Sequence, residues 1–144
     1  MAERGRILEA DDEITDVLRR AKRLAILGIK PESHASAPAH YVPAYLQRVG
    51  YDIVPVPVYY PDVTQILGQP VHRSIEDVPG DIDIVVVFRR SRDVAPHVDD
   101  IIAKKPGAVW LQLGIRNDDA AERLAEAGID VVQDRCTMIE HRSV

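Results

Sequence analysis

The sequence predicts an α/β fold in which helices cover both faces of a mainly parallel, doubly wound sheet of about five strands, giving three layers. Two observations lead to this prediction. Short, mostly apolar runs recur along the chain, and such runs are typical of strands buried on both faces. Segments with apolar residues at helical spacing alternate with these runs, which is typical of parallel crossover units. The 144 residues suit one domain spanning 1–144.

The first third of the chain predicts a helix, a strand and a second helix. In residues 11–21 the apolar positions have helical spacing, with acids at the start and arginines near the end, which matches the helix dipole. Residues 23–29 are mostly apolar and predict a buried strand. Prolines and small polar residues make 30–38 a loop, and a helix follows over about 39–49, closed by Gly50.

Residues 51–56 predict the second strand, and its prolines constrain its pairing. Pro55 and Pro57 lie two positions apart, so their missing N–H groups face the same edge, and pairing on that side should end near Val54. The next segment, 58–78, is the least regular of the chain. There we expect a turn at 61–62, a helical turn at 63–67 and a short extended piece at 70–73.

The second half of the chain predicts a regular alternation of strands and helices. The run at 82–88 is rich in β-branched residues and is typical of a strand, and Asn117 is a suitable helix N-cap. In chain order we expect a strand at 82–88, a helix at 93–103, a strand at 108–113, a helix at 117–127, a strand at 129–132 and a short helix or turn at 134–144.

Composition and charge exclude several classes of protein. The chain has 18 Lys and Arg against 23 Asp and Glu, a net charge of -5, which excludes a broadly basic nucleic-acid-binding protein. Its single cysteine, Cys136, excludes an intrachain disulfide and a multi-cysteine metal site, and we expect no metal. No apolar run approaches the ~20 residues of a membrane-spanning helix, and residues 1–12 contain no secretory h-region. We therefore expect a cytoplasmic protein.

The predicted fold indicates where a ligand would bind. In a doubly wound sheet, ligands lie beyond the carboxyl ends of the strands, where the strand order reverses. The first strand and the strand at 82–88 should flank this crevice. The segments expected to face it are 28–38, 56–60, 88–92 and 113–116.

Ordinary dinucleotide binding is disfavoured by two features. A G-x-G-x-x-G turn is absent, because Gly28 is followed by Ile29, Lys30 and Pro31. The end of the second strand reads PVY at 57–59, so it also lacks the acid that would hold the ribose hydroxyls of NAD. We therefore do not expect NAD as the cofactor.

The loop after the first strand suits an anion instead. Gly28 allows the backbone to approach a ligand closely, and the helix start near residue 39 offers free N–H groups. Lys30, His34 and His40 lie nearby. Lys30 has the equal alternative of a solvated loop cation, and the two histidines are interpreted as ordinary loop and helix-start residues rather than as metal ligands.

Two further segments carry candidate contacts. The rigid apolar stretch 56–60 could hold a flat base such as adenine, or it could simply pack against the following segment. Arg89, Arg90 and Arg92 form the strongest local basic feature of this acidic chain, and guanidinium groups bind phosphates bidentately. The alternative for these arginines is a solvated, charged loop.

Cys136 raises the alternative of nucleophilic catalysis. His141 follows five residues later, and such a mechanism needs the thiol and the imidazole within hydrogen-bond reach. The other interpretation is a small hydrophobic residue buried after the last strand. We assign no catalytic residue.

Several stretches of the chain carry a family likeness through their order and spacing. They are LAILG at 24–28, PAHYV at 38–42, YL at 45–46, GYDIVPV at 50–56, VVVFRR at 85–90, VWLQLGI at 109–115, DRC at 134–136 and IEH at 139–141. With these stretches the sequence resembles a stand-alone CoA-binding domain protein. This Rossmann-like group is similar to the N-terminal domain of the succinyl-CoA synthetase alpha subunit. The resemblance covers about residues 12–141.

The resemblance implies that CoA, free or acylated, lies across the crevice. Its pyrophosphate would meet the loop after Gly28 and the helix start, its adenine would rest near Val56 and Pro57, and the loop after Phe88 would line the adjoining part. The 3′-phosphate of CoA would explain why no acid follows the second strand. The candidate binding residues are Gly28, Ile29, Lys30, Pro38, His40, Val56, Pro57, Tyr59, Phe88, Arg89, Arg90 and Gly114.

The chain departs from the family pattern at two phosphate-contacting positions. The family usually has Asn-Pro followed by Lys or Arg after the second strand, where this chain has PVY at 57–59. The family's first loop usually carries a Ser and, before the helix, Arg-Pro, where this chain has Lys30 and, at 37–38, Ala-Pro. Lys30, Arg89 and Arg90 are the cations that could replace the lost contacts.

Three interpretations of function follow from the sequence. The first is a CoA- or acyl-CoA-binding protein without a catalytic domain of its own. The second is a CoA-dependent acyl- or thiol-transfer enzyme that uses Cys136. The third is a regulatory module that responds to a nucleotide ligand. A homo-oligomer or an unknown protein partner stays open, and neither nucleic acid nor a membrane is expected as a partner.

Overall fold

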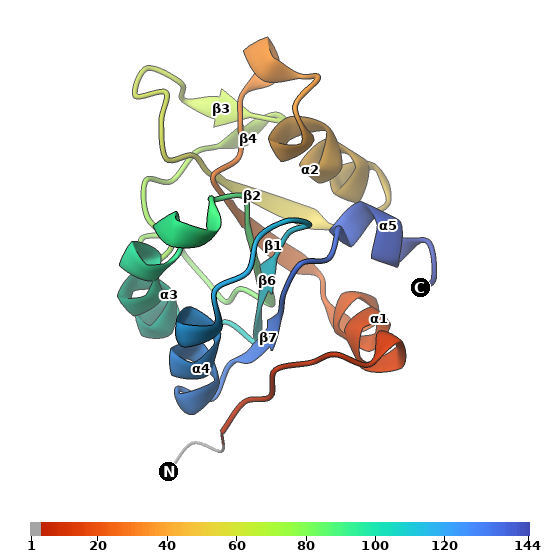
Figure 1. The fold of residues 1–144 in the computed structure, drawn as a ribbon. Helices are drawn as coiled ribbons and strands as arrows, with labels where there is room; N and C mark the ends of the chain where they lie inside the picture. The colour runs from red at the N-terminus through yellow and green to blue at the C-terminus, as the bar shows by residue number, and fades with distance from the viewer. Residues whose placement is uncertain (1–3) are drawn as a thin grey trace.

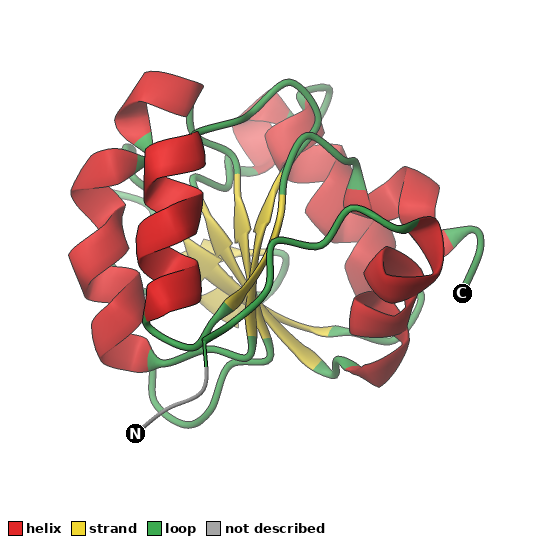
Figure 2. Ribbon diagram, turned by 60° about the horizontal axis from the view of Figure 1, so that its bottom comes forward, coloured by secondary structure: helices red, strands yellow, loops and turns green. Residues whose placement is uncertain are grey.

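The computed structural model describes residues 4–144; residues 1–3, the start of the stretch in which we expect no secretory segment, lie outside the described residues. Five parallel strands form one twisted sheet (Figure 1), and helices cover both of its faces (Figure 2). The strand order is β2-β1-β5-β6-β7. The predicted three-layer, doubly wound α/β fold is therefore confirmed.

The elements alternate along the chain as the sequence predicts. The main strands are β1 (Arg23–Leu27), β2 (Asp52–Val56), β5 (Ile84–Val87), β6 (Ala108–Leu111) and β7 (Asp130–Val132). The α-helices are α1 (Asp11–Arg20), α2 (Pro38–Arg48), α3 (Val98–Lys104), α4 (Asp118–Glu126) and α5 (Thr137–His141). The loops contain the 3-10 helices η1 (Glu32–His34), η2 (Ser91–Asp93) and η3 (Ala95–His97), and the short strands β3 (Gln65–Ile66) and β4 (Gln69–Pro70). Among the helices of residues 4–144, none has the length and apolar character needed to cross a membrane.

Two apolar cores hold the layers together. Neighbouring strand positions face opposite sides, so Leu24 and Ile26 of β1 enter one core while Ala25 and Leu27 enter the other. Helices α1 and α2 and the start of α5 close the first core, and α3 and α4 close the second (Figure 2). Because both faces are covered, every residue of β5 is buried, which explains its continuous apolar run.

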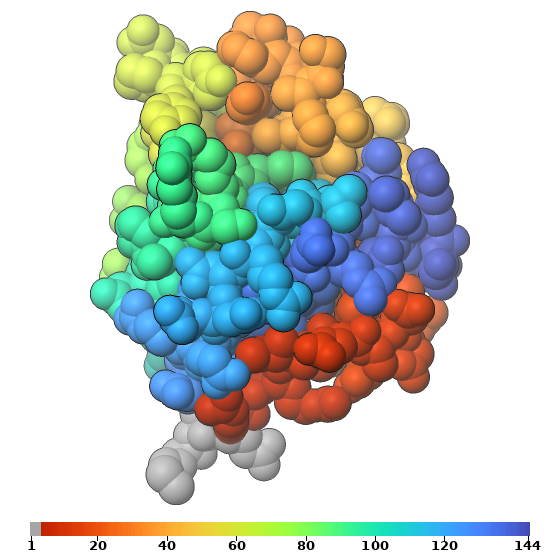
Figure 3. Space-filling view, in the orientation of Figure 1, coloured from red at the N-terminus to blue at the C-terminus, as the bar shows by residue number. Residues whose placement is uncertain are grey.

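The strand order reverses beside β1. β2 lies on one side of β1 and β5 on the other, so the loops after these three strands emerge at the same end of the sheet. Gly28 N donates to Val56 O at 2.9 Å, and Phe88 N donates to Leu27 O at 2.8 Å, which holds the three loops together where they leave the sheet. In Figure 3 the loops after β1 (orange), β2 (yellow-green) and β5 (green) gather at the upper end of the molecule. This is the end at which doubly wound folds bind ligands.

The irregular segment differs from its prediction. The helical turn expected at 63–67 is instead the antiparallel hairpin of β3 and β4. Its turn residues Leu67 and Gly68 have φ angles of 53° and 74°, and two consecutive left-handed residues match the twist of a hairpin. Ile66 of β3 is 1% exposed and joins the core closed by α1 and α2. The segment at 63–67 therefore contains a short strand with one buried side chain instead of a helical turn.

The helix predicted over 93–103 begins late because of Pro96. Proline lacks an N–H, and its ring excludes a regular helical turn before it. The chain forms η2 and η3 there, and α3 begins at Val98. Asn117 caps α4 as predicted, since its side-chain oxygen accepts the N–H of Ala120 at 3.0 Å.

Pro55 of β2 and Pro57 just after this strand face the outer edge of the sheet. Val56 O points toward β1, so Pro55 and Pro57, one residue to either side, face away from β1. β2 is an edge strand, so ladder pairing on its outer side does not continue past Val54, but Pro55 O still accepts the N–H of His72 at 3.0 Å. A proline lacks the donor but keeps the acceptor. This hydrogen bond brings the residues after β4 beside β2.

Candidate functional site

Two adjoining clefts lie at the carboxyl ends of β1, β2 and β5. We call them the Tyr59 cleft, of about 280 Å³, and the Pro38 cleft, of about 390 Å³. Both are walled by Lys30, Phe88, Arg89 and Arg90. The Tyr59 cleft is completed by Gly28, Ile29, Val58, Tyr59 and Tyr60, and the Pro38 cleft by Ala37, Pro38, Ala39, Ser91, Gly114 and Ile115. An elongated ligand could therefore lie across the shared wall.

Gly28 is required where the loops after β1 and β5 cross. Its φ is 89°, a left-handed conformation that L side chains rarely adopt. A Cβ added to Gly28 would lie 2.5 Å from the carbonyl oxygen of Phe88. The absence of a side chain thus lets the two loops touch at the floor of the Tyr59 cleft.

The loop after Gly28 is fastened to the start of α2 by both backbone groups of Lys30. Lys30 N donates to Ala39 O at 3.1 Å, and His40 Nδ1 donates to Lys30 O at 2.8 Å. In a regular helix Ala39 O would accept the N–H four residues later, but that residue is Pro43, which has none. Pro43 therefore leaves the carbonyl free to hold the loop. The Lys30 side chain reaches the clefts from a fixed backbone.

The shared wall carries three cations with different surroundings. Arg90 Nε pairs with Asp93 Oδ2 at 2.9 Å, and this hydrogen bond lowers the pKa of the Asp93 carboxyl. The guanidinium carbon of Arg89 lies 5.5 Å from the centre of the Tyr59 ring. The Nε of Arg89 is buried and has no hydrogen-bond partner. Within residues 4–144, no carboxylate forms an ion pair with Lys30 or Arg89. A cation without an ion-pair partner and a buried N–H without an acceptor suit an anionic ligand.

The positive charge of Arg89 also affects the pKa of His97 on η3. Burial lowers the pKa of His97, and the positive charge of Arg89 lowers it further, whereas Asp100 and Asp93 act in the opposite direction. The neutral imidazole is thus favoured in the folded protein. An anion bound at Arg89 would weaken this repulsion and raise the pKa of His97.

Comparison with known proteins assigns the chain to a family. Residues 22–142 match the family described as CoA binding domain. The chain belongs to the CoA-binding domain family.

Three relatives of this CoA-binding domain match it along almost its whole length. It is 33% identical over 129 residues to the uncharacterized protein YneT of Bacillus subtilis (strain 168), which covers 90% of this chain and 92% of that protein. A solved structure from Thermus thermophilus, cell-free ID.343, is 39% identical with a TM-score of 0.84, covering 94% of this chain and 98% of that one. A hypothetical protein from Pyrococcus horikoshii OT3 is 32% identical with a TM-score of 0.84, covering 99% of this chain and 98% of that one.

The structure of the CoA-binding domain brings most of the predicted site residues together. Nine of the twelve candidates line the two clefts: Gly28, Ile29, Lys30, Pro38, Tyr59, Phe88, Arg89, Arg90 and Gly114. The other three, His40, Val56 and Pro57, lie beneath the surface. His40 is 6% exposed and holds the Lys30 carbonyl, so its place is behind the loop rather than in the clefts.

Val56 and Pro57 lie deeper in the protein than the predicted contact with adenine requires. Val56 is the last residue of β2 and is fully buried in the core that α3 and α4 close, and Pro57 is buried as well. The chain reaches the cleft surface only at Val58, so Val58, Tyr59 and Tyr60 form the wall there. The continuous apolar run 53–56 could have predicted that Val56 is buried, because such runs are typical of strands covered on both faces, but the depth of Pro57 depends on tertiary packing.

Other lining residues were missed by the sequence analysis. Ser91 and Ile115 lie within segments expected to face the crevice, but nothing in the sequence distinguishes them from their neighbours. Arg73 bounds a further hollow of about 400 Å³ beside Tyr59 and Tyr60. It was missed because it follows the hairpin, which the sequence pattern does not predict.

The structure does not bring Cys136 and His141 together for nucleophilic catalysis. Cys136 is 9% exposed and packs in the core closed by α1 and α2. His141 Nδ1 lies 2.8 Å from the hydroxyl of Tyr45. Arg135, which could have activated the thiol, pairs instead with Asp11 at 2.9 Å. The arrangement matches the interpretation of Cys136 as a small buried hydrophobic residue.

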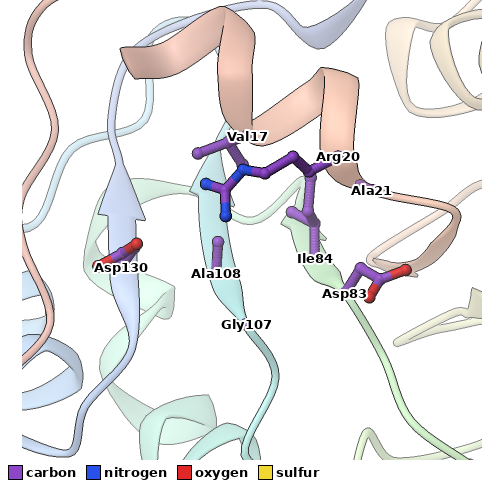
Figure 4. A pocket seen from close by; sticks show the side chains of 8 residues that line it. All are labelled: Val17, Arg20, Ala21, Asp83, Ile84, Gly107, Ala108 and Asp130. Carbon is purple, nitrogen blue, oxygen red and sulfur yellow. The ribbon is translucent and has the colours of Figure 1, made fainter. Parts of the chain in front are cut away.

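A separate pocket of about 120 Å³ lies at the amino ends of β5, β6 and β7 (Figure 4). Its carboxylates serve the fold: Asp83 Oδ2 accepts the N–H groups of Lys22 and Arg23 at 2.9 Å. Asp130 Oδ1 likewise accepts the N–H of Arg6 at 2.9 Å. Within the part of the chain that the structure describes, no group of three or more His, Cys, Asp or Glu could hold a metal ion.

Proposed function

We propose that this protein binds CoA or an acyl-CoA as a stand-alone, single-domain module over residues 1–144, without a catalytic domain of its own. The observation that carries the proposal is the meeting of Lys30 and Arg89 where the two clefts join. Neither cation has a carboxylate partner within residues 4–144, and Arg89 Nε is buried without an acceptor. Membership of the CoA-binding domain family supports the identity of the anion.

The residues fit the parts of CoA in a particular order. The pyrophosphate would lie on the shared wall, where Lys30 and Arg89 supply charge and the start of α2 supplies a positive dipole end. The adenine end would rest in the Tyr59 cleft against Val58 and Tyr59 rather than on the buried Val56. The pantetheine arm would follow the Pro38 cleft, which is lined largely by small and apolar residues.

The absence of an acid at the end of β2 supports CoA over NAD. The residues there are Val58 and Tyr59, so no carboxylate would repel a phosphate on the ribose. Arg90 is the weaker candidate contact, because Asp93 already neutralises part of its charge. The proposal includes no covalent step, since Cys136 lies in the core and outside both clefts.

Isothermal titration calorimetry with CoA, acetyl-CoA, NAD and ATP tests the proposal. We expect a saturable heat with one CoA species per chain and a much weaker signal with NAD. A clear NAD signal together with no heat or thermal shift for any CoA species would overturn it. The variant Arg48→Ala, on the exposed end of α2 and outside both clefts, is the matched control for protein quality.

A further inference from the structure

The turn that carries Tyr59 is supported from the neighbouring hairpin. The turn spans 59–63 and follows β2. The backbone just before Arg73 is fixed against β2, because His72 N donates to Pro55 O at 3.0 Å. The Arg73 side chain extends from this fixed point to the inner side of the turn.

The Arg73 guanidinium binds four backbone carbonyls of this turn. The two N–H groups of Nη2 are shared among the carbonyls of Tyr60, Pro61 and Val63, which lie 3.1, 3.3 and 2.7 Å away. Nη1 donates to the carbonyl of Tyr59 at 3.3 Å. Converging carbonyls repel one another unless a cation lies between them, and Tyr60 has a left-handed φ of 66° that a tyrosine does not favour. The turn has one backbone hydrogen bond of its own, from Val63 N to Tyr60 O at 3.1 Å, and the other converging carbonyls are bound by Arg73.

This turn sets the position of one wall of the Tyr59 cleft. Tyr59 is 61% exposed, so little of its side chain is held by packing, and its ring faces the Arg89 guanidinium at 5.5 Å. We propose that Arg73 is a positioning residue of the cleft: it clamps the 59–63 turn and thereby fixes the Tyr59 ring opposite Arg89. The proposal rests on the proposed function, because it assigns Arg73 a role in binding the nucleotide end of the ligand.

Arginine suits this role and lysine does not. A guanidinium presents five N–H donors in a rigid, planar fork, whereas an ammonium is a single charged point on a flexible stem. Within residues 4–144, Arg73 forms no ion pair, so its hydrogen bonds go to the turn. Arg73→Lys keeps the charge and removes the fork. This substitution separates clamping from a direct attraction of Arg73 for a ligand phosphate.

The clamp is tested first in the protein without ligand. Chymotrypsin cleaves after Tyr59 only when the turn opens, and the next bond is protected because Pro61 follows Tyr60. We expect Arg73→Lys and Arg73→Gln to raise the rate of cleavage after Tyr59 by roughly 3- to 10-fold, as the loss of one or two hydrogen bonds implies. Arg48→Lys, at an exposed arginine on α2, is the control and should cleave at the wild-type rate. Equal rates in all variants would overturn the clamp.

The role in binding is tested by titrating each variant with CoA and with 3′-dephospho-CoA. A positioning residue predicts that Arg73→Lys weakens both ligands by the same factor, roughly 3- to 10-fold. If Arg73→Gln lost affinity for CoA alone and Arg73→Lys restored it, Arg73 would contact the 3′-phosphate directly, which would overturn the positioning role. Unchanged affinity of the variants for both ligands would overturn it as well. If wild-type protein binds neither ligand, the proposed function fails, while the cleavage rates still decide whether Arg73 clamps the turn.

Discussion

The N–H of Lys30 donates to the carbonyl oxygen of Ala39 at 3.1 Å, and that carbonyl is free because Pro43 has no N–H to offer it. A proline inside a helix usually costs a hydrogen bond. Here the unused acceptor connects the loop after β1 to the first turn of α2. The two structures that would share the pyrophosphate, a loop cation and a helix start, are thus held in one fixed arrangement.

His40 completes this connection, and its removal should loosen the loop. His40→Phe keeps most of the buried volume but removes the Nδ1–H that Lys30 O accepts at 2.8 Å. We expect a loss of about 1–2 kcal/mol in the free energy of unfolding, measured by urea denaturation, because a part-buried carbonyl loses its donor. Tyr41→Phe, at the exposed neighbouring position, should change stability by less than about 0.5 kcal/mol. Equal effects of the two variants would contradict the role of His40.

Alanine substitutions at Gly28 and Gly114 distinguish the cost of a left-handed backbone from the cost of a steric clash. The two glycines have φ angles of 89° and 84°, but a Cβ at Gly28 would lie 2.5 Å from Phe88 O, whereas one at Gly114 would meet nothing within 4 Å. Gly114→Ala should cost about 1 kcal/mol of unfolding free energy for the left-handed φ alone. Gly28→Ala should cost about 1–3 kcal/mol more, because the loops after β1 and β5 must move apart. If the two variants lost similar amounts of unfolding free energy in urea denaturation, the loops after β1 and β5 would not be tightly packed where they cross.

Arg89 and Arg90 should contribute unequally to binding. Arg89→Ala should weaken CoA by about 1.5–3 kcal/mol, because a charged hydrogen bond is lost where the protein provides no other partner. Arg90→Ala should cost less than about 1 kcal/mol, because Arg90 is exposed and pairs with Asp93. Calorimetric titration of both variants measures the difference. A larger loss for Arg90→Ala would contradict the assignment of Arg89 as the main phosphate contact.

Acidification should destabilise the protein through His97. Burial and Arg89 lower the pKa of His97 below its ordinary value of 6.5. Below pH 6.5 the unfolded chain binds a proton that the folded chain does not, so stability falls with pH until the folded His97 is protonated as well. We expect His97→Gln to reduce the loss of stability between about pH 7.5 and 5.5. Arg89→Ala should reduce it in part, since Arg89 is one cause of the shift; an unchanged pH dependence in both variants would contradict the prediction.

Cys136 should be inert while the protein is folded. Its side chain lies in an apolar core and is 9% exposed, so a thiol reagent should react in native buffer only as fast as the protein unfolds. Cys136→Ala should lower the free energy of unfolding by about 1–2 kcal/mol through the small cavity it leaves and should leave CoA affinity unchanged. Rapid labelling of the native protein, or loss of CoA binding in this variant, would favour the alternative of a thiol-based enzyme.

The fold could be predicted because its strands carry a strong, local signal. β1 and β5 are buried on both faces and therefore read as continuous apolar runs. Their ends were predicted one or two residues too far, because Gly28 and Phe88 continue the hydrogen bonding of the sheet without belonging to a strand. The rule that ligands lie where the strand order reverses then predicted that the segments of Lys30 and Arg89 face the same crevice, although no sequence motif links them.

The remaining features of the site depend on tertiary contacts that the sequence pattern does not reveal. Pro57 follows an edge strand and is buried by tertiary packing, so its burial has no periodic signature. Arg73 reaches the site through His72, which bonds to Pro55 seventeen positions earlier in the chain. The bond between Lys30 and Ala39 requires knowing that a helix continues through Pro43.

A crystal structure of the protein soaked with CoA tests the central claim most directly. We predict density for the pyrophosphate on the wall that the two clefts share, with phosphate oxygens within hydrogen-bond distance of Arg89 and Lys30 and the adenine beside Tyr59. Arg89→Ala crystals soaked in parallel should show weaker density at the same place. Density for CoA at another surface, or empty clefts at a CoA concentration that saturates calorimetric binding, would contradict it.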